Sequence, residues 1–170
     1  MNESQSNRST AEKLAIFRAC FAGLPEVYGT YDPDTGRVWQ MKNPVTDKVL
    51  WDHITGKQPY GVYLLMKDKI NALAVDFDVE DVIPPREFIK SARPYGIAAY
   101  LERSKSKGYH VWMFYAEPVS ARKARWVVKH ILTEIGHATV ELFPKQDDLD
   151  TRTTYGNFIN APLFENPVYY

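Results

Sequence analysis

The sequence has one cysteine, no net charge and no long apolar run. The lone Cys20 excludes a disulfide framework and a cysteine-rich zinc site, and it is typical of a reducing, cytoplasmic protein. No segment approaches the roughly 20 apolar residues that span a bilayer, and the polar start lacks a signal-peptide core. We therefore expect no membrane partner, and a globular chain whose 170 residues suffice for one compact core.

The zero net charge conceals an uneven distribution along the chain. Of the 21 basic and 21 acidic residues, residues 84–129 hold ten Lys or Arg and three Asp or Glu, a net charge of +7. The remaining residues therefore carry a net charge of −7. Such polarity is compatible with nucleic-acid binding by one part of the chain, although helices with basic, solvated faces give the same count.

The N-terminal part predicts a flexible tail over residues 1–8 and a small α/β lobe over residues 9–71. Ser9 and Glu12 have the spacing of a capping box, and the apolar residues that follow share one helical face. Residues 26–60 are expected to form short strands and loops, because they are rich in Tyr, Trp, Gly and Pro, with a hairpin turn at residues 32–36. Another short strand is expected over residues 61–66.

From about residue 72 to residue 143, strand and helix patterns follow in the order β-α-β-β-α-β. Expected strands cover 72–78, 96–102, 109–115 and 138–143, and expected helices cover 84–93 and 120–135. This order is that of the RRM-like or ferredoxin-like fold, in which the first and third strands are central and helices cover one face. We therefore expect an α+β protein, a single core over residues 1–170, with the RRM-like module over residues 72–165.

Four polar side chains are expected to converge on the uncovered face of this sheet. Strand alternation turns Asp76 and Asp78 away from the helices, and it places His110 and Glu141 on the same face of neighbouring strands. Carboxylates this close repel one another unless a cation is bound, and oxygen ligands suit Mg²⁺ or Mn²⁺. Two such ions about 4 Å apart can promote phosphoryl transfer. An isolated D-x-D is more often a solvated pair, but the convergence of four groups favours a metal site.

A basic, hydroxyl-rich loop leads directly into His110. Its side chains are suited to hold a triphosphate, although a solvated hairpin loop is the more common outcome. The loop candidates are Arg103, Ser104, Lys105, Ser106 and Lys107.

Other side chains are weaker candidates for binding. One face of the helix expected over residues 120–135 carries three basic residues that either track a template or are simply solvated: Arg122, Arg125 and Lys129. Trp112 and Phe114 either stack on bases or pack under the N-terminal lobe, and packing is favoured for Phe114. Tyr63 is a weak candidate for a sugar contact.

Four segments, LAVDFD, LERSKSKGYHVWMFY, VELFPKQ and YGNFINAPL, resemble the catalytic core of the archaeo-eukaryotic primase superfamily. The resemblance spans about residues 17–165 and is greatest to primase-polymerases of bacterial mobile-element, conflict and CRISPR-associated systems. The family's D-x-D corresponds to Asp76 and Asp78, and its hydrophobic-acid motif to Val140-Glu141, where Glu replaces the more common Asp. Its S-x-H motif is altered to Gly108-Tyr109-His110. Asp147 and Asp148 are alternatives to Glu141.

The resemblance implies a template-dependent nucleotidyltransferase, a DNA primase or primase-polymerase, that extends a primer 3′-hydroxyl or an initiating nucleotide. Asp76, Asp78 and Glu141 would hold two Mg²⁺ or Mn²⁺ ions, and His110 would contact the phosphates of the nucleoside triphosphate, with no structural zinc. Lys145 joins the loop residues as a triphosphate candidate. Single-stranded template and primer, of DNA or RNA, would be partners. Because many members carry a C-terminal helical or helicase region, we expect this chain to be part of a longer protein.

Two other functions remain open at this point. A non-catalytic RRM-like module would bind single strands by aromatic stacking, but it needs no carboxylates on a face that must accept phosphates. A two-metal nuclease shares the acids, but it has less need of a long triphosphate-binding loop.

Overall fold

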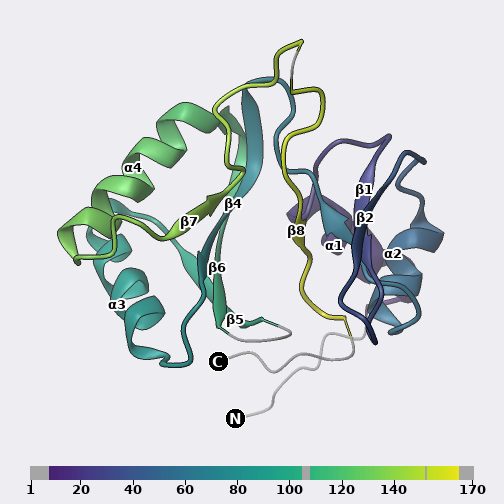
Figure 1. Ribbon diagram of the computed structural model, residues 1–170, viewed down its shortest axis with the longest axis horizontal. Helices are drawn as coiled ribbons and strands as arrows, with labels where there is room; N and C mark the ends of the chain where they lie inside the picture. Colours follow the sequence, from purple (N-terminus) through teal and green to yellow (C-terminus); the bar gives the residue numbers. More distant parts are fainter. Residues whose placement is uncertain (1–7, 105–107, 152, 165–170) are drawn as a thin grey trace.

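The protein, seen in a computed structural model that describes residues 8–104, 108–151 and 153–164, contains two antiparallel four-stranded sheets (Figure 1). The first sheet has the strand order β2-β1-β3-β8 and consists of β1 (Tyr28–Tyr31), β2 (Val38–Met41), β3 (Gly61–Val62) and β8 (Ile159–Asn160). The second has the order β5-β6-β4-β7 and consists of β4 (Lys69–Phe77), β5 (Ala99–Arg103), β6 (Tyr109–Ser120) and β7 (Glu141–Phe143). The helices are α1 (Thr10–Cys20), α2 (Asp47–Ile54), α3 (Ile83–Ala92), the short 3₁₀ helix η1 (Arg93–Tyr95) and α4 (Ala121–Glu134). None of these helices has the length and hydropathy to cross a membrane.

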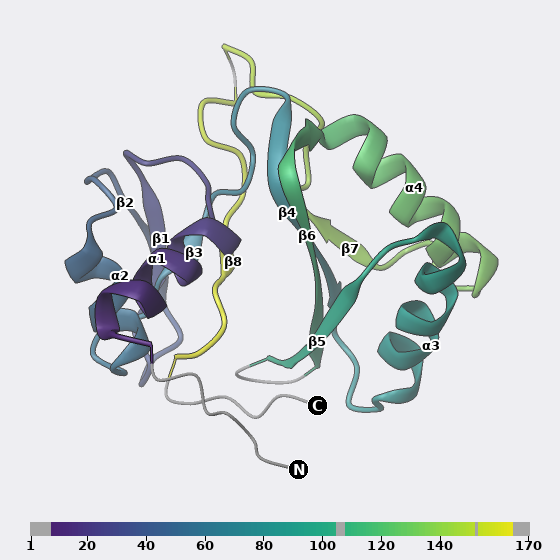
Figure 2. The same ribbon diagram turned by 180° about the vertical axis from the view of Figure 1, so that it is seen from behind.

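The second sheet with α3 and α4 has the predicted β-α-β-β-α-β order. Strands β4 and β6 are central, β7 flanks β4, and both helices lie on the same face of the sheet (Figure 2). Leu73, Val75 and Val111 of the central strands pack with Phe88 of α3 and Val128 of α4 in one buried cluster. The apolar alternation of these strands therefore faces the helices, as expected.

The N-terminal lobe confirms the predicted first helix and the hairpin. Ser9 and Glu12 form the capping box at the start of α1. Between β1 and β2, the Asp32 carboxylate accepts the backbone N–H groups of Asp34 and Thr35, each at 2.9 Å. The strand expected over residues 61–66 is shorter in the structure, where β3 covers only Gly61–Val62.

Helix α2 was not expected from the sequence, which predicted strands and loops over residues 26–60. It begins after Thr46, whose hydroxyl caps the N–H of Val49, and only Leu50 and His53 of its eight residues are buried. So short a helix has one apolar turn, and its stability comes from tertiary packing.

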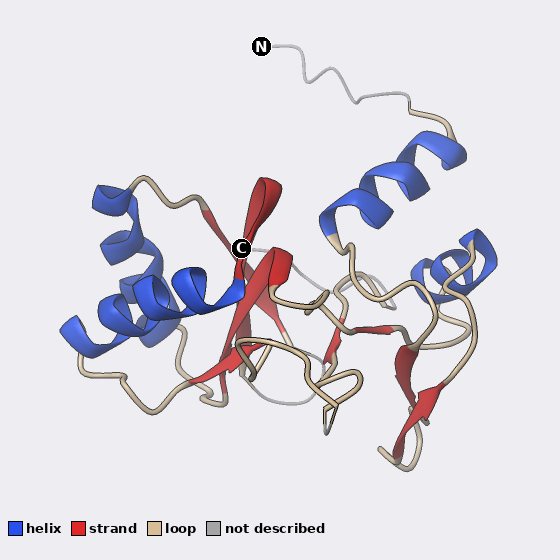
Figure 3. Ribbon diagram, turned by 90° about the horizontal axis from the view of Figure 1, so that it is seen from above, coloured by secondary structure: helices blue, strands red, loops and turns tan. Residues whose placement is uncertain are grey.

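The C-terminal segment also departs from the expected division of the chain. Strand β8 pairs with β3, so that residues 159 and 160 extend the sheet of the N-terminal lobe. Seen from above in Figure 3, two groups of helices lie on opposite sides of the molecule, and the strands lie between them.

The face of the second sheet opposite α3 and α4 is partly covered by the N-terminal lobe. Phe21 meets Trp112 and Phe114 edge-on, with ring centroids 5.1 and 5.4 Å apart. Trp112 is 2% exposed, and Phe114 is half-buried beside it. Both rings therefore pack against the lobe, as favoured for Phe114, and this face is not open over its whole length.

Candidate active site

One row of polar side chains crosses all four strands of the second sheet. The register pairs Glu102 of β5 with His110 of β6, His110 with Asp76 of β4, and Asp76 with Glu141 of β7. Directly paired residues of antiparallel strands project from the same face, about 5 Å apart. Asp78 follows one residue after the end of β4. The structure thus brings Asp76, His110 and Glu141 into neighbouring positions, as the strand pattern predicts.

Exposure increases along this row from β5 to β7. The side chains of Glu102 and His110 are 7% and 10% exposed, that of Asp76 is 32% exposed, and that of Glu141 is 57% exposed. Burial raises the pKa of Asp76, the charges of Glu141 and Asp78 add to the increase, and His110 partly opposes it. The ionised Asp76 is therefore poorly solvated and close to other carboxylates, an environment in which a cation is favourable.

His110 is held between two carboxylates. Its Nδ1 lies 3.1 Å from Oε2 of Glu102, and its Nε2 lies 3.6 Å from Oδ1 of Asp76. Burial disfavours the charged imidazolium, but the hydrogen bond to Glu102 and the charges of Glu102 and Asp76 outweigh it, so that the pKa of His110 is raised. The hydrogen bond from Nδ1 to Glu102 thus fixes the ring so that Nε2 is directed toward Asp76.

Glu102 was not among the candidates from the sequence. Its Oε2 also accepts the indole N–H of Trp112 at 2.5 Å, so one buried oxygen orients two side chains of β6. A signal was present, because alternation along β5 places Leu101 in the core and Glu102 on the face of His110.

Gly108, two residues before His110, approaches the end of β4 closely. Gly108 has a φ of +96°, and a Cβ at this position would lie 2.2 Å from the carbonyl oxygen of Phe77. The N–H of Ser104 donates to the carbonyl of Gly108 at 3.1 Å. Glycine therefore allows the chain at position 108 to pack on the backbone of Phe77 and Asp78.

The loop candidates themselves differ in their placement. Arg103 donates to the hydroxyl of Tyr109 at 2.6 Å, and both side chains lie on the face of the sheet opposite His110. Lys105, Ser106 and Lys107 lie outside the described residues.

Lys145 lies beside Glu141, at the β7 end of the row. Its ammonium nitrogen is 2.7 and 2.9 Å from the two oxygens of Glu141, so this ion pair now neutralises the carboxylate. Among the residues that the structure describes, no three His, Cys, Asp or Glu side chains are close enough together to hold a metal ion. Carboxylate oxygens such as those of Asp76, Asp78 and Glu141 are the type of ligand that Mg²⁺ and Mn²⁺ prefer, but Glu141 would have to turn away from Lys145 to join the two aspartates.

The remaining candidates have structural partners. Arg125 is buried, donates to the carbonyl of Pro144 at 2.8 Å and lies 3.1 Å from Asp147, so it is not exposed to track a template. Arg122 pairs with Asp147 and Asp148 at 3.6 and 3.8 Å, which places both acids beside α4. Lys129 is exposed on α4.

Tyr63 is buried in the N-terminal lobe. Its hydroxyl accepts a hydrogen bond from Nε2 of Gln40 at 2.8 Å, and its ring contacts that of Phe158. This placement gives Tyr63 a role in packing the lobe.

Comparisons with known proteins agree with this architecture. The polymerase domain from Mycobacterium tuberculosis ligase D, solved in complex with DNA, superposes with a TM-score of 0.55 at 17% identity, over 73% of this chain and 59% of that chain. The present chain thus spans about three fifths of that domain. The archaeo-eukaryotic primase domain of the cyanophage S-2L primase-polymerase superposes with a TM-score of 0.50 at 13% identity, over 90% of this chain and 91% of that one. At these identities the likeness is one of fold.

The sequence comparison identifies the family. No curated protein matches the chain. A family described as the archaeo-eukaryotic primase domain of the TOTE conflict system matches residues 35–169, which include all four residues of the polar row. The match covers most of the sequence, and the chain belongs to this family of archaeo-eukaryotic primase domains.

Proposed function

We propose that the chain is a template-dependent nucleotidyltransferase, a primase-polymerase that adds nucleotides to a primer 3′-hydroxyl or to an initiating nucleotide. The observation that carries this proposal is the row of Glu102, His110, Asp76 and Glu141 across the sheet. Asp76 and Glu141 lie next to each other in this row, and the fixed imidazole of His110 lies beside Asp76. This arrangement fits a reaction at a phosphate, where anionic groups must be brought together.

Each residue of the row has a distinct part in this proposal. Asp76, Asp78 and Glu141 would hold two Mg²⁺ or Mn²⁺ ions, which lower the pKa of an attacking hydroxyl and neutralise a leaving pyrophosphate when bound. His110, with Nδ1 occupied by Glu102, offers Nε2 to a phosphate oxygen of the nucleoside triphosphate. Lys145 is close enough to Glu141 to bind the same triphosphate once that carboxylate turns toward a metal.

The nucleic-acid partner follows from the family rather than from any single contact. Membership of a primase domain family, together with a fold shared with a polymerase domain solved in complex with DNA, supports single-stranded template and primer as partners.

Primer extension tests the proposed reaction. With a primed template, nucleotides and Mg²⁺ or Mn²⁺, the wild type should lengthen the primer, and the double variant Asp76→Ala, Asp78→Ala should not. Asp34→Ala, in the exposed turn between β1 and β2, is the matched control and should extend normally. Normal extension by the double variant would contradict the assignment of the acids. Cleavage of the strands in place of extension would instead identify a two-metal nuclease.

His110→Ala provides a second test of the same site. It should raise the KM for the nucleotide more than it weakens template binding, because His110 is assigned to the phosphates of the nucleotide. Equal losses of nucleotide use and template binding would contradict that role.

A further inference from the structure

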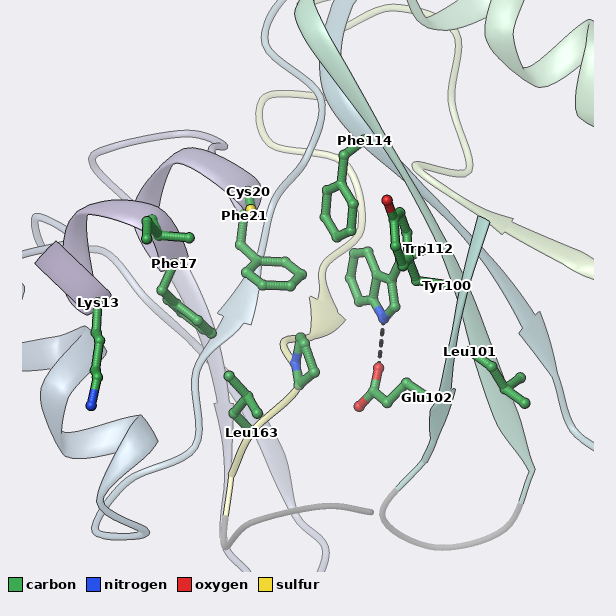
Figure 4. Close-up of a pocket in the computed structure, with 12 residues that line it drawn as sticks. Lys13, Phe17, Cys20, Phe21, Tyr100, Leu101, Glu102, Trp112, Phe114 and Leu163 are labelled. Carbon is green, nitrogen blue, oxygen red and sulfur yellow. Dashed lines mark hydrogen bonds between the residues drawn. The ribbon is translucent and has the colours of Figure 1, made fainter. Parts of the chain in front are cut away.

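A largely apolar pocket of about 420 Å³ opens between α1 and the strands β5 and β6. Figure 4 shows Phe21, which directly follows α1, close to Trp112 and Phe114 of β6, and these three rings form one wall of the pocket. Tyr100 and Ile16 also line it, and they are 57% and 44% exposed. Large apolar side chains exposed together around a concave, aromatic site are typical of a surface that binds a ligand.

Two polar groups border this aromatic pocket. Within the described part of the chain, both hydrogen bonds to Glu102 fall on Oε2, so Oε1 remains able to accept another. The carboxylate points into the space between β5 and the segment that carries Leu163 (Figure 4). On the other side, Lys13 of α1 lines the pocket and is exposed. The pocket thus combines aromatic walls, a buried acceptor and an accessible cation.

We propose that this pocket receives an unpaired base of a bound nucleic-acid strand. A base is flat enough to lie against the exposed ring of Tyr100, which lies beside Phe114. Its N–H groups match Oε1 of Glu102, and the adjoining phosphate matches Lys13. Proteins that hold single strands without reading their sequence use this combination of aromatic stacking and basic groups. An aliphatic ligand would supply no donor to Oε1 of Glu102, and the carboxylate would repel a free anion.

The position of the pocket indicates which base it takes. Glu102 is two strands away from Asp76 in the polar row, so the pocket lies beside the proposed reaction site and outside it. A base whose polar edge faces Glu102 cannot pair with another base at the same time. This step rests on the proposed function: the pocket holds an unpaired base of the bound strand, one that is not being copied at that moment.

Cys20 allows a direct test, because it lines the pocket and is the only cysteine in the sequence. The rate at which N-ethylmaleimide alkylates Cys20 is measured by intact-mass spectrometry. It is compared with and without a saturating single-stranded oligo(dA), and no metal or nucleotide is present. Saturation is confirmed by fluorescence anisotropy. Stacking of a base on an aromatic ring contributes about 1 kcal/mol or more, which favours the occupied pocket over the empty pocket by about fivefold. Alkylation of Cys20 should therefore slow at least about fivefold.

The comparison ligands decide the outcome. An abasic oligonucleotide of the same length, and deoxyadenosine monophosphate at the same concentration, should leave the alkylation rate unchanged. An unchanged rate with saturating oligo(dA), equal protection by the abasic strand, or equal protection by the mononucleotide would each overturn the proposal.

Variants of the intact chain supply the matched control. Tyr100→Ala should reduce the protection, whereas Trp126→Ala, which removes a 70% exposed ring from α4, should not. Because the assay contains no metal or nucleotide, base binding stands even if primer extension fails. Extension by the wild type without any protection of Cys20 would refute the pocket while leaving the proposed function intact.

Discussion

Removing the carboxylate of Glu102 should disturb both stability and activity. Glu102→Ala deletes the acceptor shared by the buried ring N–H groups of His110 and Trp112. A buried donor left unsatisfied costs about 1–3 kcal/mol, so two should lower the free energy of unfolding by about 2–6 kcal/mol. Glu102→Gln keeps an oxygen for both donors and loses only the charge assistance, about 1 kcal/mol for each bond.

The effect on activity comes from the orientation of His110. Loss of a carboxylate that orients a metal-bound histidine typically reduces activity about 10- to 100-fold, and we expect the same range for primer extension by Glu102→Ala, in which the lost carboxylate orients His110 in the same way. Urea unfolding followed by circular dichroism, together with KM and kcat for the nucleotide, measures the two effects. Trp112→Phe is the control, because it removes one donor and leaves the His110–Glu102 bond in place, so extension should stay near the wild-type rate. Glu102→Ala with wild-type stability and wild-type extension would refute this reasoning.

Three further predictions concern single residues. Because burial raises the pKa of Asp76, its ionised form is disfavoured in the folded state, and Asp76→Asn should raise the Tm at pH 7 while abolishing extension. This gain in Tm should grow as the pH rises from the ordinary 3.8 through the raised pKa, and a lower Tm for the variant at pH 7 would contradict it. Both Gly108→Ala and Gly36→Ala place a side chain at a positive φ, which costs about 1–3 kcal/mol in backbone strain. In urea unfolding, Gly36→Ala should show this loss alone, because its Cβ meets nothing within 4 Å. Gly108→Ala should lose more, because its Cβ would collide with Phe77. Burial lowers the pKa of His53, so its contribution to stability is present above the ordinary 6.5 and lost as the pH falls through the lowered value. The pH dependence of the Tm below 6.5 should therefore be smaller in His53→Phe than in the wild type, and equal slopes would contradict it.

The topology of the second sheet could be predicted because its sequence signals are local and consistent. Alternating apolar residues such as Leu73 and Val75 identify the strands, and the element order then restricts the sheet to one familiar arrangement. Strand alternation was also enough to place Asp76 and His110 on one face. The pairing of Asp76 with both His110 and Glu141 follows from that arrangement.

Features that depend on side-chain contacts could not be predicted in the same way. Arg125 has the helical spacing of a solvated cation, yet its long side chain reaches the carbonyl of Pro144 and is buried. Glu102 has the alternation of the open face, but its importance depends on the exact register with His110 and on the indole of Trp112. Helix α2 has too few apolar positions for a helical period to be recognised.

The central claim is that the acids of β4 and β7 form a metal-dependent site for nucleotide addition. The most direct measurement is anomalous scattering from a crystal soaked with Mn²⁺ and a nucleoside triphosphate. We predict manganese peaks bounded by Asp76, Asp78 and Glu141, with the phosphates of the nucleotide next to His110. Manganese and nucleotide bound elsewhere, with Glu141 still paired to Lys145, would contradict the claim.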